Sequence, residues 1–430
     1  MGNRWRGIPA LLHTPIGRRQ LLWSLYQAGW PLLSILAKGY RRTLGRKTHI
    51  VAVVGSYGKS TTMRATACAL KVRVHRLSLR NSRSFVAGAV LRNWPHHRHA
   101  VIEVGIDGPG QMAGYAAIIR PDTTIVTSIG SEHNRSLASL EITRSEKSEM
   151  VRILSPLGVA VLNGDDPNVL WMKSHIQARV VTFGLADTND VRATNIKLDW
   201  PNGTTFRLHA NGETRNLAIR LIGQPMVYPI LAAVATSLAE GFSLDQIIPT
   251  LENLSPTPGR LEPIRLPNGA FVLRDDFKSP LETIDAALDV LGEIPAKKRI
   301  VVLGDVSEPF GRQWQIYRKI GEHIAQVATK AIFITGKFRA YAAGARVGGL
   351  PSSSLVDVGG SFLEAIDALR QDLGLGDVIL IKGRDTQRLD RITLSLTGRT
   401  INCNVTFCNT KAARCGHCPM LERGWKGKTL

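Results

Sequence analysis

A seven-residue loop, GSYGKST at positions 55–61, lies between an apolar β-branched run and a helix-forming segment and limits the possible folds more than any other part of the chain. A loop of this kind directs backbone N–H groups and a helix N-terminus toward phosphate oxygens. Its lysine neutralises charge on the β- and γ-phosphates, and its serine hydroxyl can ligate Mg²⁺. Val53 stands where the full phosphate-loop pattern has its first glycine, so the match is partial. The predicted nucleotide ligands are Gly55, Ser56, Tyr57, Gly58, Lys59, Ser60 and Thr61, and Ser60 is also a predicted Mg²⁺ ligand.

From His49 onward, short β-branched runs alternate with helical patterns, which is typical of parallel α/β units. Asn-Gly turn signals predict antiparallel hairpins over residues 191–221. We predict an α/β fold in which a phosphate-loop central domain with a parallel sheet precedes a smaller Rossmann-like C-terminal α/β domain. The expected divisions are a basic amphipathic segment (1–48), a central ATP-binding domain (49–258), a C-terminal domain (259–397) and a cysteine-rich tail (398–430).

The charge is unevenly distributed along the 430 residues. Lys and Arg number 55 against 34 Asp and Glu, which gives a net charge of +21. No acidic residue precedes Glu103, whereas 18 basic residues do, so the rest of the chain is close to neutral. A basic front end favours an anionic partner, and membrane lipid, nucleic acid and a phosphorylated substrate are the candidates. Nucleic acid is the least favoured of the three, because no recognised nucleic-acid-binding motif accompanies the charge.

The first apolar run, residues 21–37, is flanked by basic residues on both sides. As a helix its 17 residues would span about 26 Å, less than the roughly 30 Å hydrocarbon core of a bilayer. Trp23, Tyr26 and Trp30 suit a helix at a lipid interface. Packing on the chain's own domain or on a partner, interfacial contact with an anionic membrane, and a true span all stay open. With no evident signal peptide and only five cysteines, we expect a cytoplasmic protein, peripheral on the inner membrane face if this run contacts lipid.

Eight further short motifs follow the phosphate loop: VIEVG at 101–105, TSIGSEH at 127–133, RSEK at 144–147, NGDD at 163–166, PGRLE at 258–262, DDFKS at 275–279, VLGD at 302–305 and IKGR at 381–384. With the loop, they resemble the Mur ligases, ATP-dependent enzymes that join amino acids to peptidoglycan precursors and related acids. The shortened GxxGK[ST]T loop is that family's own form, so the departure at Val53 is itself a match. The likeness covers residues 49–397 and is greatest for the D-alanyl-D-alanine-adding branch.

The resemblance implies ATP and Mg²⁺ as cofactors and assigns roles to residues. It implies Glu103 and His133 as Mg²⁺ ligands, and Lys147 at a position that is carbamylated in several members. It implies nucleotide contacts for Asn163, Arg260 and Asp276, and its implied catalytic set is Lys59, His133, Lys147, Asp276 and Lys278. The chemistry agrees independently, because acyl-phosphate formation needs a metal to neutralise the transferred phosphoryl group. Each residue also has an ordinary alternative role. These are a surface carboxylate for Glu103, a loop imidazole for His133, a helix-face charge for Lys147, a linker cation for Arg260 and a turn pair for Asp276 and Lys278.

Two departures from the family pattern matter for function. The segment that helps to seat adenine in the family has a His and two Asn, and residues 223–233 carry none of them. Only 48 residues precede the first predicted strand, so we expect the family's N-terminal UDP-binding domain to be absent. The sequence therefore favours an ATP-dependent amide ligase that joins an amino acid or peptide to an unidentified carboxylate acceptor, in cell-envelope or polyamino-acid biosynthesis. The alternative is a Mur-like nucleotide-binding scaffold or partner subunit that does not ligate.

The tail concentrates four of the five cysteines: Cys403, Cys408, Cys415 and Cys418. Clustered thiolates suit tetrahedral Zn²⁺, and a 33-residue tail with little apolar content would need a metal to fold. Only the second pair has CxxC spacing, and His417 is a candidate substitute for one cysteine. Free thiols, a redox pair and an iron–sulfur cluster are the alternatives to zinc.

Overall fold

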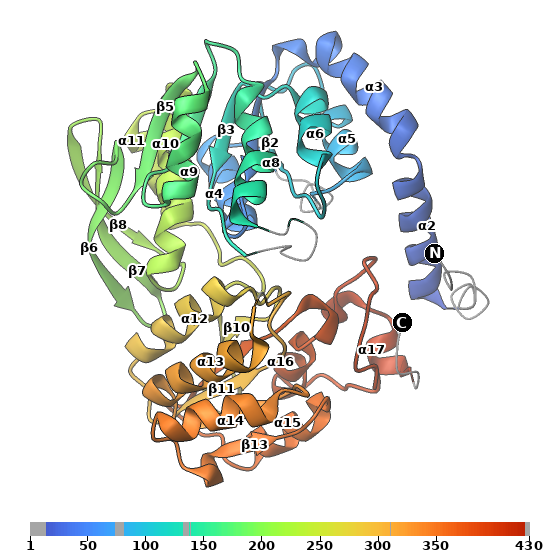
Figure 1. Cartoon of the computed structure of the whole chain (residues 1–430), viewed down its shortest axis with the longest axis vertical. Coiled ribbons are helices and arrows are strands. Elements are labelled where there is room, and N and C mark those ends of the chain that lie inside the picture. The colour runs from blue at the N-terminus through green and yellow to red at the C-terminus, as the bar shows by residue number, and fades with distance from the viewer. Residues whose placement is uncertain (1–13, 74–80, 132–136, 138, 310, 426–430) are drawn as a thin grey trace. The chain divides into compact units, whose positions relative to one another are not determined.

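The computed structural model describes residues 14–73, 81–131, 137, 139–309 and 311–425, and it divides into two compact units (Figure 1). One unit is Gln27–Thr257. The other is Pro258–Leu430 together with Met1–Tyr26. The basic front end is therefore shared between the units: α2 (Pro15–Ala28) lies largely with the C-terminal residues, whereas α3 (Trp30–Arg42) belongs to the phosphate-loop unit.

The first unit is built on an eight-stranded sheet with the order β2-β1-β3-β4-β5-β6-β7-β8. Pairing is parallel from β2 across to β6, and antiparallel from β6 to β8. The parallel strands read as continuous apolar runs because helices bury both faces, whereas β6 alternates. The strands are β1 (His49–Val54), β2 (His99–Glu103), β3 (Thr123–Val126), β4 (Val159–Asn163), β5 (Arg179–Gly184), β6 (Val191–Asp199), β7 (Gly203–Ala210) and β8 (Glu213–Ile219).

Each face of this sheet has its own core. Val51 and Val53 of β1 point into one cluster, and Ile50 and Ala52 point into the other, as the period of two requires. The first cluster is covered by α4 (Lys59–Ala69), α10 (Val227–Ala239) and α11 (Leu244–Glu252). The second is covered by α3, α5 (Ser84–Leu91), α6 (Gln111–Ile119), α8 (Leu140–Arg152) and α9 (Pro167–Leu170).

The last strand, β8, forms one edge of the sheet. Its residues toward the turn are largely exposed, and Glu213 and Arg215 form an ion pair there. At its other end the backbone N–H of Ala218 donates to the side chain of Glu252 at the end of α11 (3.1 Å). The edge therefore carries charge at one end and a satisfied backbone donor at the other.

The second unit contains a six-stranded sheet with the order β13-β12-β11-β14-β10-β9, in which only β9 is antiparallel to its neighbour. This mostly parallel sheet with helical crossovers confirms the predicted α/β class and a Rossmann-like second domain. Its strands are β9 (Glu262–Arg265), β10 (Phe271–Asp275), β11 (Arg299–Leu303), β12 (Lys330–Phe333), β13 (Leu355–Asp357) and β14 (Val378–Lys382). Its helices are α12 (Leu281–Glu293), α13 (Gln313–Val327), α14 (Phe338–Val347), α15 (Phe362–Arg370), α16 (Asp390–Leu396) and, in the tail, α17 (Met420–Arg423).

The apolar run 21–37 forms two helices rather than one, because the chain leaves α-helical geometry around Gly29. Among the described helices, none is both long enough and apolar enough to cross a bilayer. One face of α3 packs through Trp30, Leu33 and Ala37 against the core under α5 and α6.

A buried arginine holds α3 in place. The Arg41 guanidinium donates to the carbonyls of Gly45 (2.7 Å), Thr48 (3.0 Å) and Ile119 (2.9 Å), and it pairs with Asp122 (2.7 Å). Asp122 also accepts the backbone N–H of Ile50 in β1 (2.8 Å). One side chain thus connects the front-end helix to two loops and, through Asp122, to β1.

We expect Arg41→Met to lower the free energy of unfolding by on the order of 3 kcal/mol, because it leaves buried carbonyls and a carboxylate without their donor. Urea unfolding followed by circular dichroism measures this change. Arg42→Met is the matched control, since Arg42 is exposed and its loss should cost less than about 0.5 kcal/mol. Equal losses in the two variants would contradict the anchoring role.

Candidate functional site

The phosphate loop connects the carboxyl end of β1 to the N-terminus of α4, and two glycines determine its path. A Cβ at Gly55 would lie 2.0 Å from the Thr127 hydroxyl oxygen, so only glycine fits beside the end of β3. Gly58 immediately precedes α4 with a φ of +82°, in the left-handed region that favours glycine. The loop therefore leaves the N-terminus of α4 open to an anion.

Thr127 and Ser128, at the end of β3, fix the other side of the loop. The Thr127 hydroxyl donates to the carbonyl of Tyr57 (2.6 Å), and the Tyr57 N–H donates to the Ser128 hydroxyl (2.9 Å). The Ser56 N–H donates to the Ser128 carbonyl (2.9 Å). In the sequence, Thr127 and Ser128 stand out only as part of the motif at 127–133. Polar residues directly after a buried strand were the available signal for a role in holding the loop.

Two buried lysines converge on the loop from different helices. The Lys59 ammonium donates to the carbonyls of Gly55 (2.8 Å) and Ser56 (2.9 Å), and the Lys147 ammonium of α8 donates to the Ser56 hydroxyl (2.7 Å). The Ser56 hydroxyl also donates to the Gly130 carbonyl and accepts from the Gly130 N–H. Since Lys147 is buried, it does not lie on a solvated helix face. The loop is therefore strongly electropositive, as a polyphosphate site requires.

Glu103 ends β2 one strand away, where it pairs in register with Val53 of β1. Its side chain is 2% exposed, and one carboxylate oxygen accepts from the Asn81 amide (2.7 Å). The other oxygen is buried and has no hydrogen-bond partner among the described residues. An orphaned carboxylate oxygen beside a phosphate loop fits a Mg²⁺ ligand. The Ser60 hydroxyl, at the start of α4, is the other predicted ligand among the described residues. His133, the third predicted ligand, lies outside the described residues.

Asn163, a predicted nucleotide contact, is buried at the end of β4. Its amide donates to the Thr127 carbonyl (2.9 Å), and its carbonyl oxygen accepts from the Asp165 N–H (3.1 Å). Its described contacts therefore hold the end of β3, which in turn supports the phosphate loop. This makes Asn163 a positioning residue in the structure.

The divergent segment 223–233 becomes a short 3₁₀ turn, Gln224–Met226, followed by the buried helix α10. The Tyr228 hydroxyl donates to Asp165 (2.9 Å), a carboxylate that also accepts the Leu185 N–H (2.6 Å). Burial, together with the Asp165 charge, holds the pKa of Tyr228 well above its usual range. The segment thus provides core packing and one tyrosine–carboxylate contact in place of the family's His and Asn.

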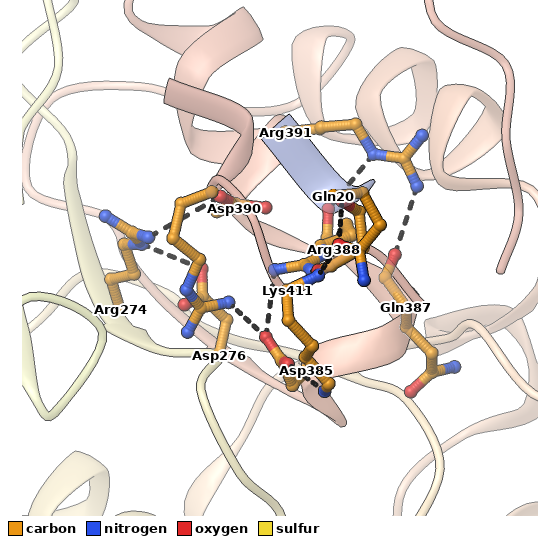
Figure 2. A network of polar contacts seen from close by, with 11 residues as sticks. Gln20, Arg274, Asp276, Asp385, Gln387, Arg388, Asp390, Arg391 and Lys411 are labelled. Atoms are coloured by element: carbon orange, nitrogen blue, oxygen red, sulfur yellow. Dashed lines mark hydrogen bonds and ion pairs between the residues drawn. The ribbon is translucent and has the colours of Figure 1, made fainter. Parts of the chain in front are cut away.

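In the second unit, Asp276 follows β10 and is almost completely buried. One of its oxygens accepts from the Arg274 guanidinium (2.7 Å), while the other has no hydrogen-bond partner among the described residues. Burial raises the pKa of Asp276 to about 6, the nearby Asp390 carboxylate adds to the rise, and Arg274 opposes it. Figure 2 shows Arg274 directed toward both of these carboxylates.

The neighbours of Asp276 have different surroundings. Asp275 forms a buried ion pair with Lys382 of β14, and burial lowers the pKa of Lys382. The Lys278 backbone carbonyl accepts from Lys382 (3.3 Å), and the Lys278 side chain is half-buried. The Arg260 guanidinium lies over the Phe277 ring, 4.5 Å from its centroid. Asp275 is therefore bound within the sheet, whereas Asp276 keeps one free oxygen.

An open parallel sheet with a phosphate loop at the carboxyl ends of its strands, followed by a second α/β sheet, defines a two-domain nucleotide-binding α/β protein. Two family models match in the same order: the Mur ligase middle domain over residues 53–237, and the Mur ligase, glutamate ligase domain over residues 259–384. This chain belongs to the Mur ligase family.

Among its relatives, the UDP-N-acetylmuramoyl-tripeptide–D-alanyl-D-alanine ligase of Escherichia coli is 30% identical over 293 residues, which cover 67% of this chain. The chain spans 64% of the length of that relative. The Bacillus subtilis ligase of the same name is 25% identical, with 85% of this chain and 79% of the relative covered.

Solved structures share the fold. MurF from Acinetobacter baumannii superposes with a TM-score of 0.76 at 23% identity, over 86% of this chain and 81% of that one. A folylpolyglutamate synthase from Mycobacterium tuberculosis superposes with a TM-score of 0.65 at 16% identity, over 86% and 95% of the two chains.

The raised pKa of Asp276 predicts a pH dependence of stability. Because its folded-state pKa exceeds the unfolded value of about 3.9, the folded state binds more protons in this window, and stability from this group falls as pH rises. Relative to the Asp276→Asn variant, the free energy of unfolding of the native protein should fall by roughly 2 kcal/mol between about pH 4 and pH 7. Urea titrations across that range test this. Asp372→Asn is the control with the opposite sign, since Lys298 holds the pKa of Asp372 below its usual value. If the difference in unfolding free energy between the native protein and Asp276→Asn does not change with pH, the raised pKa of Asp276 is contradicted.

Proposed function

We propose that this chain is an ATP-dependent amide ligase. It would activate a carboxylate as an acyl phosphate and join it to the amine of an amino acid or peptide. The observation that carries the proposal is the buried, partly unsatisfied Glu103 carboxylate beside a phosphate loop that retains Lys59 and Ser60. Membership of the Mur ligase family and the D-alanyl-D-alanine ligase relatives support the same reaction class.

The reaction proceeds in two balanced steps. A substrate carboxylate oxygen attacks the γ-phosphorus of ATP and releases ADP. The amine then attacks the acyl carbon, phosphate leaves, and the amine loses a proton. Bound Mg²⁺ would neutralise charge on the transferred phosphoryl group. In this proposal the N-terminus of α4 and the Lys59 ammonium bind the phosphates, while Glu103 and Ser60 hold the ion.

Further residues have proposed roles that depend on the bound state. We propose that Arg260, Asp276 and Lys278 serve the same reaction from the second unit, the first two at the nucleotide. Lys147 contacts the loop through Ser56, and carbamylation would replace its cation with a carboxylate able to help hold a second Mg²⁺. A Zn²⁺ held by the tail cysteines completes the proposed cofactor set.

The substrates are proposed by class. The relatives named for adding D-alanyl-D-alanine favour a cell-envelope peptide or its carboxylate precursor, and the folylpolyglutamate synthase fold neighbour makes a glutamate chain the other class to test. The divergent segment 223–233 specifically favours a second candidate, a nucleotide-binding scaffold without ligase activity, because it lacks the family's adenine-seating side chains.

We expect amine-stimulated release of ADP and phosphate when ATP and Mg²⁺ are supplied with a panel of carboxylates and of amino acids, including D-alanyl-D-alanine. Lys59→Ala should abolish this turnover, because it removes the cation of the loop. Glu103→Gln should raise the Mg²⁺ concentration for half-maximal rate at least tenfold. Lys173→Ala and Glu141→Gln, both at exposed positions, are the matched controls.

The two candidate functions predict different results in this experiment. ATP binding that depends on Lys59, with no amine-stimulated turnover across the panel, would favour the scaffold. A folded Lys59→Ala protein with normal turnover would refute the role of the phosphate loop.

We also propose that α3 contacts an anionic membrane surface. The face of α3 opposite its packed side exposes Leu32 (64%), Ile35 (69%) and Leu36 (51%), and Lys38 and Arg42 are exposed beside them. Apolar side chains next to cations on one surface helix match an interfacial lipid-binding helix. Within its own unit, α2 likewise exposes Leu22 and Leu25 together with Arg18 and Arg19.

We expect the full chain to sediment with vesicles that contain phosphatidylglycerol, and to do so less as salt increases. The triple variant Leu32→Gln, Ile35→Gln, Leu36→Gln should weaken binding at least tenfold, because three apolar contacts are lost while the buried Arg41 anchor is kept. Leu157→Gln, which changes an exposed leucine elsewhere, is the control. Binding that is unaffected by the triple substitution or by salt would contradict the proposal.

A further inference from the structure

The cysteine-rich tail encloses a small cavity of about 20 Å³, enough for one water molecule or ion. All four tail cysteines line it, although they are separated by up to 15 positions in the sequence. All four are free thiols. His417 is exposed and does not line the cavity, so the structure gives no support to it as a substitute ligand. The lining residues are Cys403, Cys408, Cys415, Cys418, Arg388, Arg391, Val405, Thr410, Ala413, Met420 and Leu421.

Two of the lining side chains are buried cations. Arg391 is 1% exposed, and its guanidinium donates only to backbone carbonyls, those of Gln387 (3.0 Å), Arg388 (3.1 Å) and Cys403 (3.2 Å). No carboxylate among the described residues forms an ion pair with it. A buried charge without a counter-charge is costly, so an arginine in this position calls for an anion.

Arg388 has a carboxylate partner but leaves one of its donor atoms unsatisfied. It is 2% exposed and pairs with Asp385 (3.0 Å) through one terminal nitrogen, while its Nε atom has no acceptor among the described residues. An unpaired donor on a buried cation at the wall of a thiol-lined cavity is a second feature that suits an anionic group in that cavity.

We infer that this cavity is a tetrathiolate Zn²⁺ centre whose negative charge is balanced by Arg388 and Arg391. Four cysteine thiols and one Zn²⁺ give a complex with a net charge of −2 and release four protons. The two guanidinium groups carry the opposite charge. Arg391 has no carboxylate partner among the described residues, and Arg388 shares its partner Asp385 with Lys411 and Arg414, so both can offset the charge of the complex. Zinc–sulfur bonds of about 2.3 Å in tetrahedral geometry suit four thiolates around one small void.

Within the described residues, no three metal-binding side chains are yet gathered closely enough to hold an ion. The sulfurs that line the cavity must therefore close inward when metal binds.

The centre would also fix the tail against the loop that carries Asp276 and Phe277. The Cys408 N–H donates to the Thr386 carbonyl (2.8 Å), and Arg414, one residue before Cys415, donates to Asp385 (2.6 Å). The Arg414 guanidinium lies over the Phe277 ring, 4.0 Å from its centroid. In Figure 2, Asp385 and Lys411 of this network lie close to Gln20 of α2, whose side chain accepts from the Lys411 N–H (2.9 Å).

The full chain, purified without chelator, should contain one zinc per molecule by elemental analysis. Replacing Zn²⁺ with Co²⁺ should give the intense thiolate charge-transfer bands of a tetrahedral Co²⁺–thiolate site. Arg391→Gln should speed zinc release to a chromogenic chelator at least tenfold. Arg399→Gln should change it less than twofold, because Arg399 also contacts the tail, at the Gly416 carbonyl, but already pairs with Glu422.

Three outcomes would overturn the inference: less than about half a zinc per chain with four freely reactive tail thiols, iron with labile sulfide, or equal release rates in the two arginine variants. If Arg391→Gln fails to fold, the Co²⁺ spectrum of the native chain decides the ligand set on its own. None of these measurements uses ATP, so they are independent of the proposed ligase activity.

Discussion

The architecture of the first unit depends on keeping the backbone of the phosphate loop accessible at the carboxyl end of a parallel sheet. Gly55 passes so close to Thr127 that a methyl group would collide with its hydroxyl, and the Thr127 and Ser128 side chains satisfy the backbone on the far side of the loop. Because these bonds leave the N-terminus of α4 free, the positive end of that helix stays available. Asn163 secures Thr127 in turn, so three neighbouring strand ends determine one loop.

Features that depend on local order could be predicted from the sequence. The phosphate loop, the alternation of strands and helices, and the antiparallel patch after β5 all follow from residues that are neighbours in the chain, and the structure contains each of them. The apolar run 21–37 was harder to interpret, because its two ends belong to different units and Gly29 divides it. No periodicity within the run shows that division.

Contacts between distant residues could not be predicted. Asn81 reaches Glu103 across 22 positions, and Arg41 reaches Asp122 across 81. Neither pair belongs to a pattern of spacing. The burial of Arg388 and Arg391 beside the tail cysteines could not be predicted for the same reason, because these residues lie on the turn before α16 and at its start, where basic residues are ordinarily exposed. A buried arginine is visible only once the fold shows what surrounds it.

The outer strand of the large sheet has a consequence for how the protein behaves in bulk. An edge strand offers unpaired backbone groups to which a strand of another molecule can add, and long apolar edges lead to ribbon-like aggregates. In β8 the Glu213–Arg215 pair would have to be desolvated by an incoming strand, and the Ala218 N–H is already bonded to Glu252. Growth of the sheet into a neighbouring molecule is therefore opposed at both ends of β8, which favours solubility at high concentration.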